Sequence, residues 1–91
     1  MFYVYILECQ DKTLYTGYTV DLDNRLLAHN QGQGAKYTRG RLPVKLVYQE
    51  SLDSKSEAMK REISIKKLSR KEKIDLIFNM QKNRRTLCHL K

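Results

Sequence analysis

YVYILECQDKTLYTGYT, residues 3–19, decides the fold expected for this chain of 91 residues. Two runs rich in tyrosine and aliphatic residues flank a polar segment, which predicts a β-hairpin. Alternate residues of a strand share a face. If the turn holds an odd number of residues, Tyr5 and Tyr15 lie on the same side of the hairpin, with Gly17 beside them. The hairpin is therefore expected to present two phenols next to a gap without a side chain.

The segments that follow predict a helix, a loop and a third strand. Asp21 is a natural N-cap for a helix that ends near Asn30. Residues 31–43 hold three of the four glycines and the only proline, which indicates a loop. Residues 44–51 alternate as a strand does, and we expect this strand to be central because Val47 interrupts its polar face.

The second half of the chain contains two S-x-x-E capping boxes, each of which predicts a helix. The first box opens a helix from Ser54 to about Leu68, and the second opens a helix from Ser69 to about Met80. The expected apolar face of the second helix consists of Ile74, Ile77 and Phe78. The fold class is α+β, a three-stranded antiparallel sheet flanked by helices in the order β-β-α-β-α-α. Residues 1–80 form one domain, and residues 81–91 form a basic, loosely held tail.

The charge of the chain is unevenly distributed. Residues 1–30 carry two basic and four acidic residues, a balance of −2, whereas the remaining sixteen basic and six acidic residues give residues 31–91 a balance of +10. This asymmetry favours a polyanion partner held by one side of the molecule. A basic surface that serves only solubility is the alternative.

The rest of the composition predicts a cytoplasmic protein without a membrane span. Two cysteines, Cys9 and Cys88, have no zinc-ligand spacing and form no disulfide framework, which favours two free thiols in a reducing compartment. No apolar run approaches the roughly 18 residues of a transmembrane helix. The N-terminus lacks the pattern of a signal peptide.

One carboxylate occupies an unexpected position. At 100° per residue, the apolar face of the helix from Ser54 is formed by Ala58, Met59, Ile63 and Ile65. Glu62 projects from the middle of this face. A buried carboxylate without a partner costs several kcal/mol. Either a cation of the chain, such as Lys66 one turn along, or a metal ion should therefore lie beside it.

The first helix carries two further polar groups beside its packed face. Arg25 and His29 are one turn apart and flank Leu22 and Leu26. Both side chains are expected where the helix meets the sheet. A histidine in such a position is either a packing or capping residue or, if the other polar groups converge on it, part of a site.

These residues together resemble the GIY-YIG nuclease superfamily, in particular its small stand-alone bacterial members, the YhbQ/YazA-like proteins. The resemblance covers roughly residues 2–78. It is carried by two short signature elements, an arginine eight residues after the second of them, a helical glutamate and a basic loop: Tyr3-Val4-Tyr5, Tyr15-Thr16-Gly17, Arg25 in LDNRLLAHN, Glu62 in EAMKREISIKK, and GAKYTRGRLPVKLVY. Tyr3 replaces the leading glycine of the family pattern, and Tyr18 stands where some family nucleases have a lysine.

The resemblance implies metal-assisted hydrolysis of phosphodiester bonds in nucleic acid, DNA in the first place. Glu62 would hold one divalent ion, Mg²⁺ or Mn²⁺, and Arg25 would stabilise charge on the phosphate. Tyr15 would activate or position the attacking water with Tyr5 in support, while Gly17 leaves room for the phosphate. His29 is a further candidate for proton transfer. A tyrosine is a weak base unless nearby cations lower its pKa, and Arg25, His29 and the ion are expected to do so.

Three functions remain open on the sequence. The first is a structure-selective endonuclease that acts in DNA repair or recombination, a monomer whose specificity a protein partner supplies. The second is a nucleic-acid-binding module on the same fold without catalysis, and the third an interaction domain that binds no nucleic acid. In the first two cases, exposed basic side chains would contact phosphates. The candidates for these contacts are Lys36, Arg39, Arg41, Lys66 and Lys67.

Overall fold

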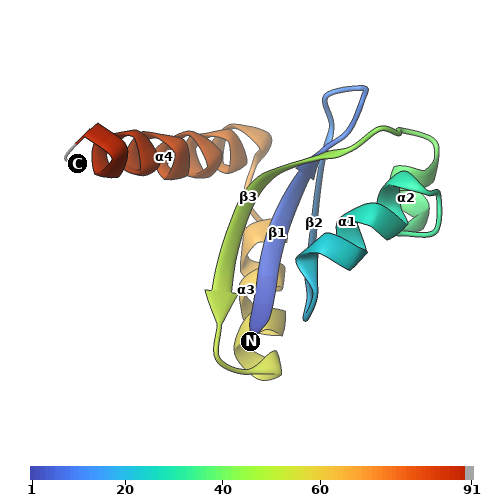
Figure 1. Cartoon of the computed structure of the whole chain (residues 1–91), viewed down its shortest axis with the longest axis horizontal. Helices are drawn as coiled ribbons and strands as arrows, with labels where there is room; N and C mark the ends of the chain where they lie inside the picture. Colours follow the sequence, from blue (N-terminus) through green and yellow to red (C-terminus); the bar gives the residue numbers. More distant parts are fainter. Residues whose placement is uncertain (90–91) are drawn as a thin grey trace.

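The computed structural model describes residues 1–89, with side chains for residues 1–80. Its elements are β1 (Phe2–Glu8), β2 (Leu14–Thr19), α1 (Leu22–Asn30), α2 (Lys36–Arg39), β3 (Lys45–Leu52), α3 (Lys55–Lys66) and α4 (Arg70–His89) (Figure 1). The strands form one antiparallel sheet in the order β2-β1-β3. The predicted α+β class and its element order are confirmed. The difference is α2, a short helix within the segment that was expected to be a loop.

The hairpin has the register that the alternation predicts. Tyr5 pairs with Gly17, and Leu7 pairs with Tyr15. Paired residues project to the same side of an antiparallel sheet. Tyr5 and Tyr15 therefore share a face, and their ring centroids lie 6.4 Å apart. Gly17 lies directly opposite Tyr5, and the Tyr5 ring fills the space that a side chain at Gly17 would occupy.

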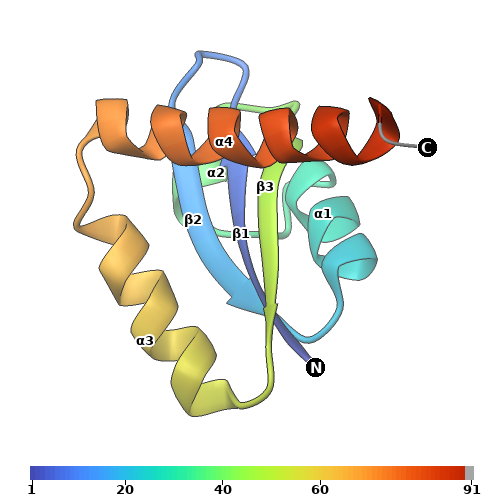
Figure 2. The same ribbon diagram turned by 90° about the vertical axis from the view of Figure 1, so that its left-hand side faces the viewer.

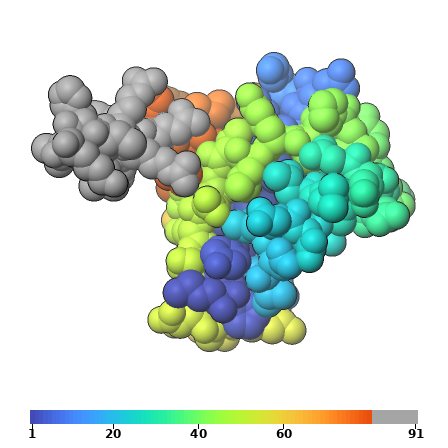
Figure 3. All heavy atoms as spheres, in the orientation of Figure 1, coloured from blue at the N-terminus to red at the C-terminus, as the bar shows by residue number. Residues whose placement is uncertain are grey.

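The sheet has two different faces, each covered by helices. On one face, Val4 and Ile6 of β1 form a core with Ala58 and Ile65 of α3. On the other face, Tyr5 and Leu7 form a second core, against which two leucines of α1, Leu22 and Leu26, pack. Figure 1 shows α1 and α3 on opposite sides of the strands. In the space-filling view, α1 and the segment 31–43 form a continuous surface beside β3 (Figure 3).

β3 is an edge strand in the sheet of the described residues, so the expectation that it is central is wrong. The misleading signal has a physical cause. Val47 packs against the core on the α3 side, while Leu46 packs against the core on the α1 side. Because core residues lie on both faces of β3, three consecutive apolar residues, Leu46–Tyr48, interrupt its alternation as they do in a central strand.

Helix α3 buries a narrower stripe than its sequence predicts. Its N-terminus is capped as expected, because the Ser54 hydroxyl accepts a hydrogen bond from the Glu57 backbone N–H at 3.1 Å. Ala58 and Ile65 are fully buried, but Met59 and Ile63 remain 43% and 51% exposed. The last two were expected on the buried face. The buried stripe runs through Ala58 and Ile65, and the half-buried Arg61 and Glu62 flank it on either side.

Helix α4 is longer than predicted and packs through other residues. It continues to His89 rather than ending near Met80. Leu76, Ile77 and Met80 pack against the core, whereas Ile74 and Phe78 are 43% and 63% exposed. Figure 2 shows why: α4 runs across the strands instead of along them, so only one stripe of the helix reaches the sheet.

The C-terminal end of the chain and one of the two cysteines lie partly outside the described residues. The side chain of Cys88 and residues 90–91 lie outside the described residues. That residues 81–91 form a loosely held tail stays a prediction. Cys9 is a buried free thiol. Within the part of the chain that the structure describes, no helix combines the length and apolar character needed to cross a membrane.

Candidate active site

A buried hydrogen-bonded chain lies between β1 and the helices of the α1 face. The Tyr5 hydroxyl is 3.1 Å from Nε2 of His29, and Nδ1 of His29 is 2.9 Å from the Thr38 hydroxyl. The Thr38 hydroxyl in turn lies 2.9 Å from the backbone carbonyl of Ala35. Tyr5, His29 and Thr38 are all at least 98% buried. The sheet, α1 and α2 thus each contribute one member of a chain closed off from water.

Two glycines make room for this chain. A Cβ atom on Gly17 would lie 2.6 Å from the Tyr5 hydroxyl oxygen, and one on Gly34 would lie 2.2 Å from Nδ1 of His29. Real Cβ atoms essentially never make contacts this short. Gly17 therefore allows Tyr5 to lie flat across β2, and Gly34 allows His29 to pack against the segment that precedes α2.

Arg25 brings a permanent positive charge to the same cluster. The nearby hydroxyl of Tyr5, and to a lesser extent that of Tyr15, raises the pKa of Arg25 further. Burial raises the pKa of Tyr5, although Arg25 opposes this shift. Burial lowers the pKa of His29, and the charge of Arg25 adds to the effect. His29 is therefore a neutral imidazole at neutral pH, so the expectation that it acts as a cation toward the tyrosines is wrong.

Tyr15 lies at the outer side of the cluster in a row of aromatic rings. Its centroid is 5.4 Å from that of His29 and 5.9 Å from that of Tyr37, on which it stacks at 28°. The guanidinium of Arg41 covers the Tyr37 ring at 4.3 Å from its centroid. This row connects the buried histidine with the exposed surface of α2.

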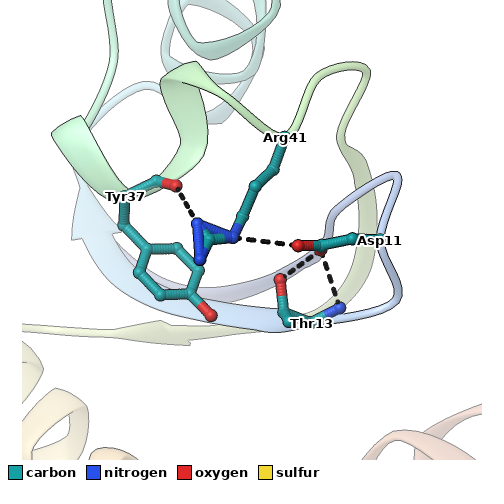
Figure 4. A network of polar contacts seen from close by, with 4 residues as sticks. All are labelled: Asp11, Thr13, Tyr37 and Arg41. Atoms are coloured by element: carbon teal, nitrogen blue, oxygen red, sulfur yellow. Dashed lines mark hydrogen bonds and ion pairs between the residues drawn. The ribbon is translucent and has the colours of Figure 1, made fainter.

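Three contacts hold the guanidinium of Arg41 in place. Its guanidinium donates to Asp11 at 3.0 Å and to the Tyr37 carbonyl at 3.2 Å, in addition to its stacking on the Tyr37 ring (Figure 4). Thr13 donates to the same Asp11 carboxylate through both its hydroxyl and its backbone N–H. Arg41 therefore ties the turn of the hairpin to α2 and holds Tyr37 in place.

Glu62 approaches this cluster from the other side of the sheet. It projects from α3, which packs over the opposite face from α1, and it is not in hydrogen-bond contact with the four clustered residues Tyr5, Tyr15, Arg25 and His29. Its charge nevertheless contributes to the raised pKa of Tyr5, as the smallest of the causes. Its Oε1 atom is 3.4 Å from Nζ of Lys66, and the side chains of Glu62 and Lys66 are 18% and 51% exposed. The lysine one turn along thus lies beside Glu62, as considered from the sequence.

The donor set around Glu62 is that of a weakly held ion. Within the described residues, no three side chains of the His, Cys, Asp or Glu type gather where they could bind a metal. Glu62 would therefore contribute a single carboxylate, with waters and a substrate phosphate completing the coordination. Mg²⁺ is commonly bound in this way, because it dehydrates reluctantly and keeps several waters. The residues present fit such an ion.

The remaining basic candidates are divided between two places. Lys36 and Arg39 are exposed on α2, next to the aromatic row. Lys66 and Lys67 are exposed at the end of α3, next to Glu62. The two pairs thus lie on helices that cover opposite faces of the sheet.

Sequence reasoning missed Asn30, Gly34, Tyr37 and Thr38, each of which shapes the site. Asn30 joins α1 to the start of β3 by two hydrogen bonds with the backbone of Val44, at 2.8 and 3.2 Å. The other three belong to GAKYTRGRLPVKLVY, a stretch that carried the resemblance but was assigned no role except for its basic residues. A buried threonine and an extra glycine in a loop give no periodic signal, since the partner that explains them is distant in the sequence.

Comparison with known proteins agrees with the fold. A family model described as the GIY-YIG catalytic domain matches residues 1–75. The chain therefore belongs to the GIY-YIG family, whose fold is that of a nuclease domain.

Relatives of similar length share most of the chain. A UPF0213 protein of Staphylococcus saprophyticus is 59% identical over 75 residues, which cover 82% of this chain and 92% of the relative. A UPF0213 protein of Syntrophus aciditrophicus is 63% identical over 76 residues, with coverages of 82% and 87%. The solution structure of a UPF0213 protein from Bacillus halodurans is 54% identical and has a TM-score of 0.55, with coverages of 85% and 83%. The similarity thus extends to small stand-alone proteins of this kind.

Proposed function

We propose that this protein is a metal-dependent endonuclease that hydrolyses phosphodiester bonds in DNA and selects its target by structure rather than by sequence. The observation that carries this proposal is the convergence of a permanently charged guanidinium, a buried neutral histidine and two phenols around a glycine gap. Such a site offers a cation for a phosphate and hydroxyl groups for a water molecule, at a place where a side chain is missing from the sheet.

Each residue of the cluster has a task in this proposal. Arg25 binds the scissile phosphate and stabilises the charge that develops on it, since preorganised donors of this kind act strongly where water is excluded. Tyr15, at the outer side of the cluster, orients the attacking water. Tyr5 supports Tyr15 from the buried side of the cluster. The hydrogen bond from Tyr5 to Nε2 of His29 offers a path for a proton. Gly17 leaves the space that the Tyr5 ring occupies and so keeps the Tyr5 hydroxyl within the cluster.

Glu62 would hold the divalent ion together with waters and the phosphate. A bound Mg²⁺ or Mn²⁺ stabilises negative charge on the phosphoryl group and on the leaving oxygen. The ion pair with Lys66 does not oppose this role. Because the Lys66 side chain is half exposed, such a pair is worth about 0.3–0.5 kcal/mol and is easily replaced.

The decisive experiment compares wild type with Glu62→Ala and the matched variant Glu62→Gln. The substrates are labelled duplex, flap, fork and single-stranded DNA, each incubated with Mg²⁺ or Mn²⁺ and with EDTA. We expect cleavage by wild type only with the ion, and a loss of about 10²–10³ in rate for both variants, as when one stabilising group is removed from a transition state. Binding of DNA should stay level or become slightly tighter.

Thermal melts in EDTA accompany this assay. If Glu62 serves the ion, both variants should melt within a few degrees of wild type, because the exposed pair with Lys66 contributes little. A wild type that cleaves none of the substrates with either ion, together with a Glu62→Ala variant that melts far below it, would contradict the proposal and favour a binding module on the same fold.

The binding module is the second candidate function, and the charge distribution supports it independently of catalysis. The balance of +10 over residues 31–91 provides backbone contacts in either case. With about four to six phosphates neutralised, log K against log[salt] should have a slope of about −4 to −5. A slope near zero would contradict both nucleic-acid functions. A role in DNA repair or recombination, a cytoplasmic location, a monomeric state and a protein partner that supplies specificity stay predictions.

A further inference from the structure

The four groups of the buried chain can satisfy one another in only one direction. The hydroxyl of Thr38 has a single proton, and the Ala35 carbonyl, 2.9 Å away, can only accept it. Having donated to Ala35, Thr38 can only accept from Nδ1 of His29, 2.9 Å away on its other side. Nδ1 must then carry the imidazole proton, which leaves Nε2 as an acceptor.

The surroundings of Tyr5 favour the same direction. Arg25 has donors only and lies close enough to affect the pKa of Tyr5, so the side of the Tyr5 oxygen that faces Arg25 carries lone pairs. The Tyr5 proton then has Nε2 of His29, at 3.1 Å, as its acceptor. In the opposite tautomer, Nε2–H and Arg25 would both point donors at the Tyr5 oxygen. The Tyr5 proton would have no acceptor within this chain, at a side chain only 2% exposed.

We infer that Thr38 is a positioning residue that fixes His29 in its Nδ1–H tautomer and thereby turns the hydroxyl proton of Tyr5 inward, toward Nε2. The lone pairs of the Tyr5 oxygen then face Arg25. A water molecule that reaches them meets an oriented acceptor rather than a freely rotating hydroxyl. Thr38 touches no substrate in this assignment and acts only through His29 and Tyr5.

Burial makes this control effective. Thr38 and His29 are both fully buried, so water cannot replace a missing partner of Nδ1. An unsatisfied buried donor is costly, and His29 without the Thr38 oxygen would favour the tautomer with its proton on Nε2. That change would reverse the hydrogen bond to Tyr5. The place of Gly34 against the His29 ring supports the assignment, because a side chain there would push the imidazole away from Thr38.

The test is the tautomer itself, read by long-range ¹H–¹⁵N correlation spectra of the histidine rings. The proteins are wild type, Thr38→Val, Thr38→Ser and, as a control for the loss of a buried threonine hydroxyl, Thr16→Val. Thr16 is 97% buried, its hydroxyl has no hydrogen-bond partner among the described residues, and it projects to the opposite face. We expect the Nδ1–H form in wild type, Thr38→Ser and Thr16→Val, and the Nε2–H form in Thr38→Val. An Nε2–H imidazole in wild type, or an unchanged tautomer in a folded Thr38→Val, would overturn the inference.

The effect of Thr38 on catalysis rests on the proposed nuclease function and is measured separately. Thr38→Val should lower the cleavage rate by about 10- to 100-fold, the effect commonly seen when the partner that orients a functional histidine is removed. DNA affinity should remain unchanged, and Thr38→Ser should restore most of the rate. Equal cleavage by wild type and a Thr38→Val protein with the switched tautomer would overturn the catalytic part. If wild type cleaves nothing, the proposed function fails while the spectra still decide the role of Thr38.

Discussion

The two faces of β1 are built from neighbouring residues of one strand but follow different rules. Val4 and Ile6 contact aliphatic side chains of α3, and any apolar group of similar volume would satisfy that face. Tyr5, between them in sequence, lies in a chain in which each donor has a defined acceptor. The first face needs volume, whereas the second needs volume, direction and protonation state. The strand period of two residues allows both demands to be met within three consecutive positions.

The difference should appear as a separation of stability from activity. Ile6→Ala removes fully buried aliphatic volume and should lower the free energy of unfolding by about 2–5 kcal/mol, while the protein that remains folded keeps its cleavage rate. Tyr5→Phe retains the ring and should lower the free energy of unfolding by only about 1 kcal/mol, yet lose most of the cleavage. Urea denaturation and single-turnover cleavage measure the two quantities. If both variants lost stability and cleavage to the same extent, the proposed difference between the two faces of β1 would be contradicted.

The α1 face should also be the less tolerant of an added methyl group. In Gly34→Ala the new Cβ would overlap Nδ1 of His29 and lie 2.8 Å from its Cα. We expect a destabilisation of about 1–3 kcal/mol, typical of overpacking. Gly40→Ala is the matched control, because nothing lies within 4 Å of a Cβ at Gly40. Thermal and urea unfolding of both variants should show a loss for Gly34→Ala alone; a loss of equal size at Gly40 would contradict the close packing around His29.

A smaller effect concerns pH. The pKa of His29 is lowered by burial and by Arg25, and the other groups that face its ring, Tyr5, Tyr15 and Thr38, are neutral. The unfolded chain therefore binds a proton at His29 more readily than the folded one. The part of the free energy of unfolding that depends on an uncharged His29 is fully present above the unfolded pKa of about 6.5. It is lost as the pH falls from there toward the lower pKa of the folded state.

The measurement is the urea midpoint of wild type and of His29→Gln, followed from about pH 8 down to about pH 5. Wild type should lose stability below about pH 6.5, and the slope of His29→Gln should be flatter. His89 is common to both proteins, so the difference in slope belongs to His29. Identical slopes would show that the imidazole titrates freely in the folded state.

Much of the secondary structure and strand pairing could be predicted because it depends on short-range sequence patterns. The hairpin register followed from the alternation around Tyr5 and Tyr15, and α1 followed from the cap at Asp21, whose carboxylate accepts from the Asn24 N–H at 3.2 Å. Patterns failed where packing chose among several apolar residues. Met59 and Ile63 lie on the apolar side of α3 in the sequence, but the sheet buries Ala58 and Ile65 instead.

The candidate site shows the same division. The sequence by itself determined which residue types are available and which face of the hairpin holds the phenols, because side-chain alternation in a strand is a local property of the backbone. Only the tertiary structure decided that Thr38 and Gly34 close around His29, that Arg41 is engaged by Asp11, and that Glu62 comes from the opposite face. The physical reason is that the hydrogen-bond partners and steric limits of buried groups are set by segments far apart in the sequence. The spacing of these segments along the chain does not predict that they come into contact.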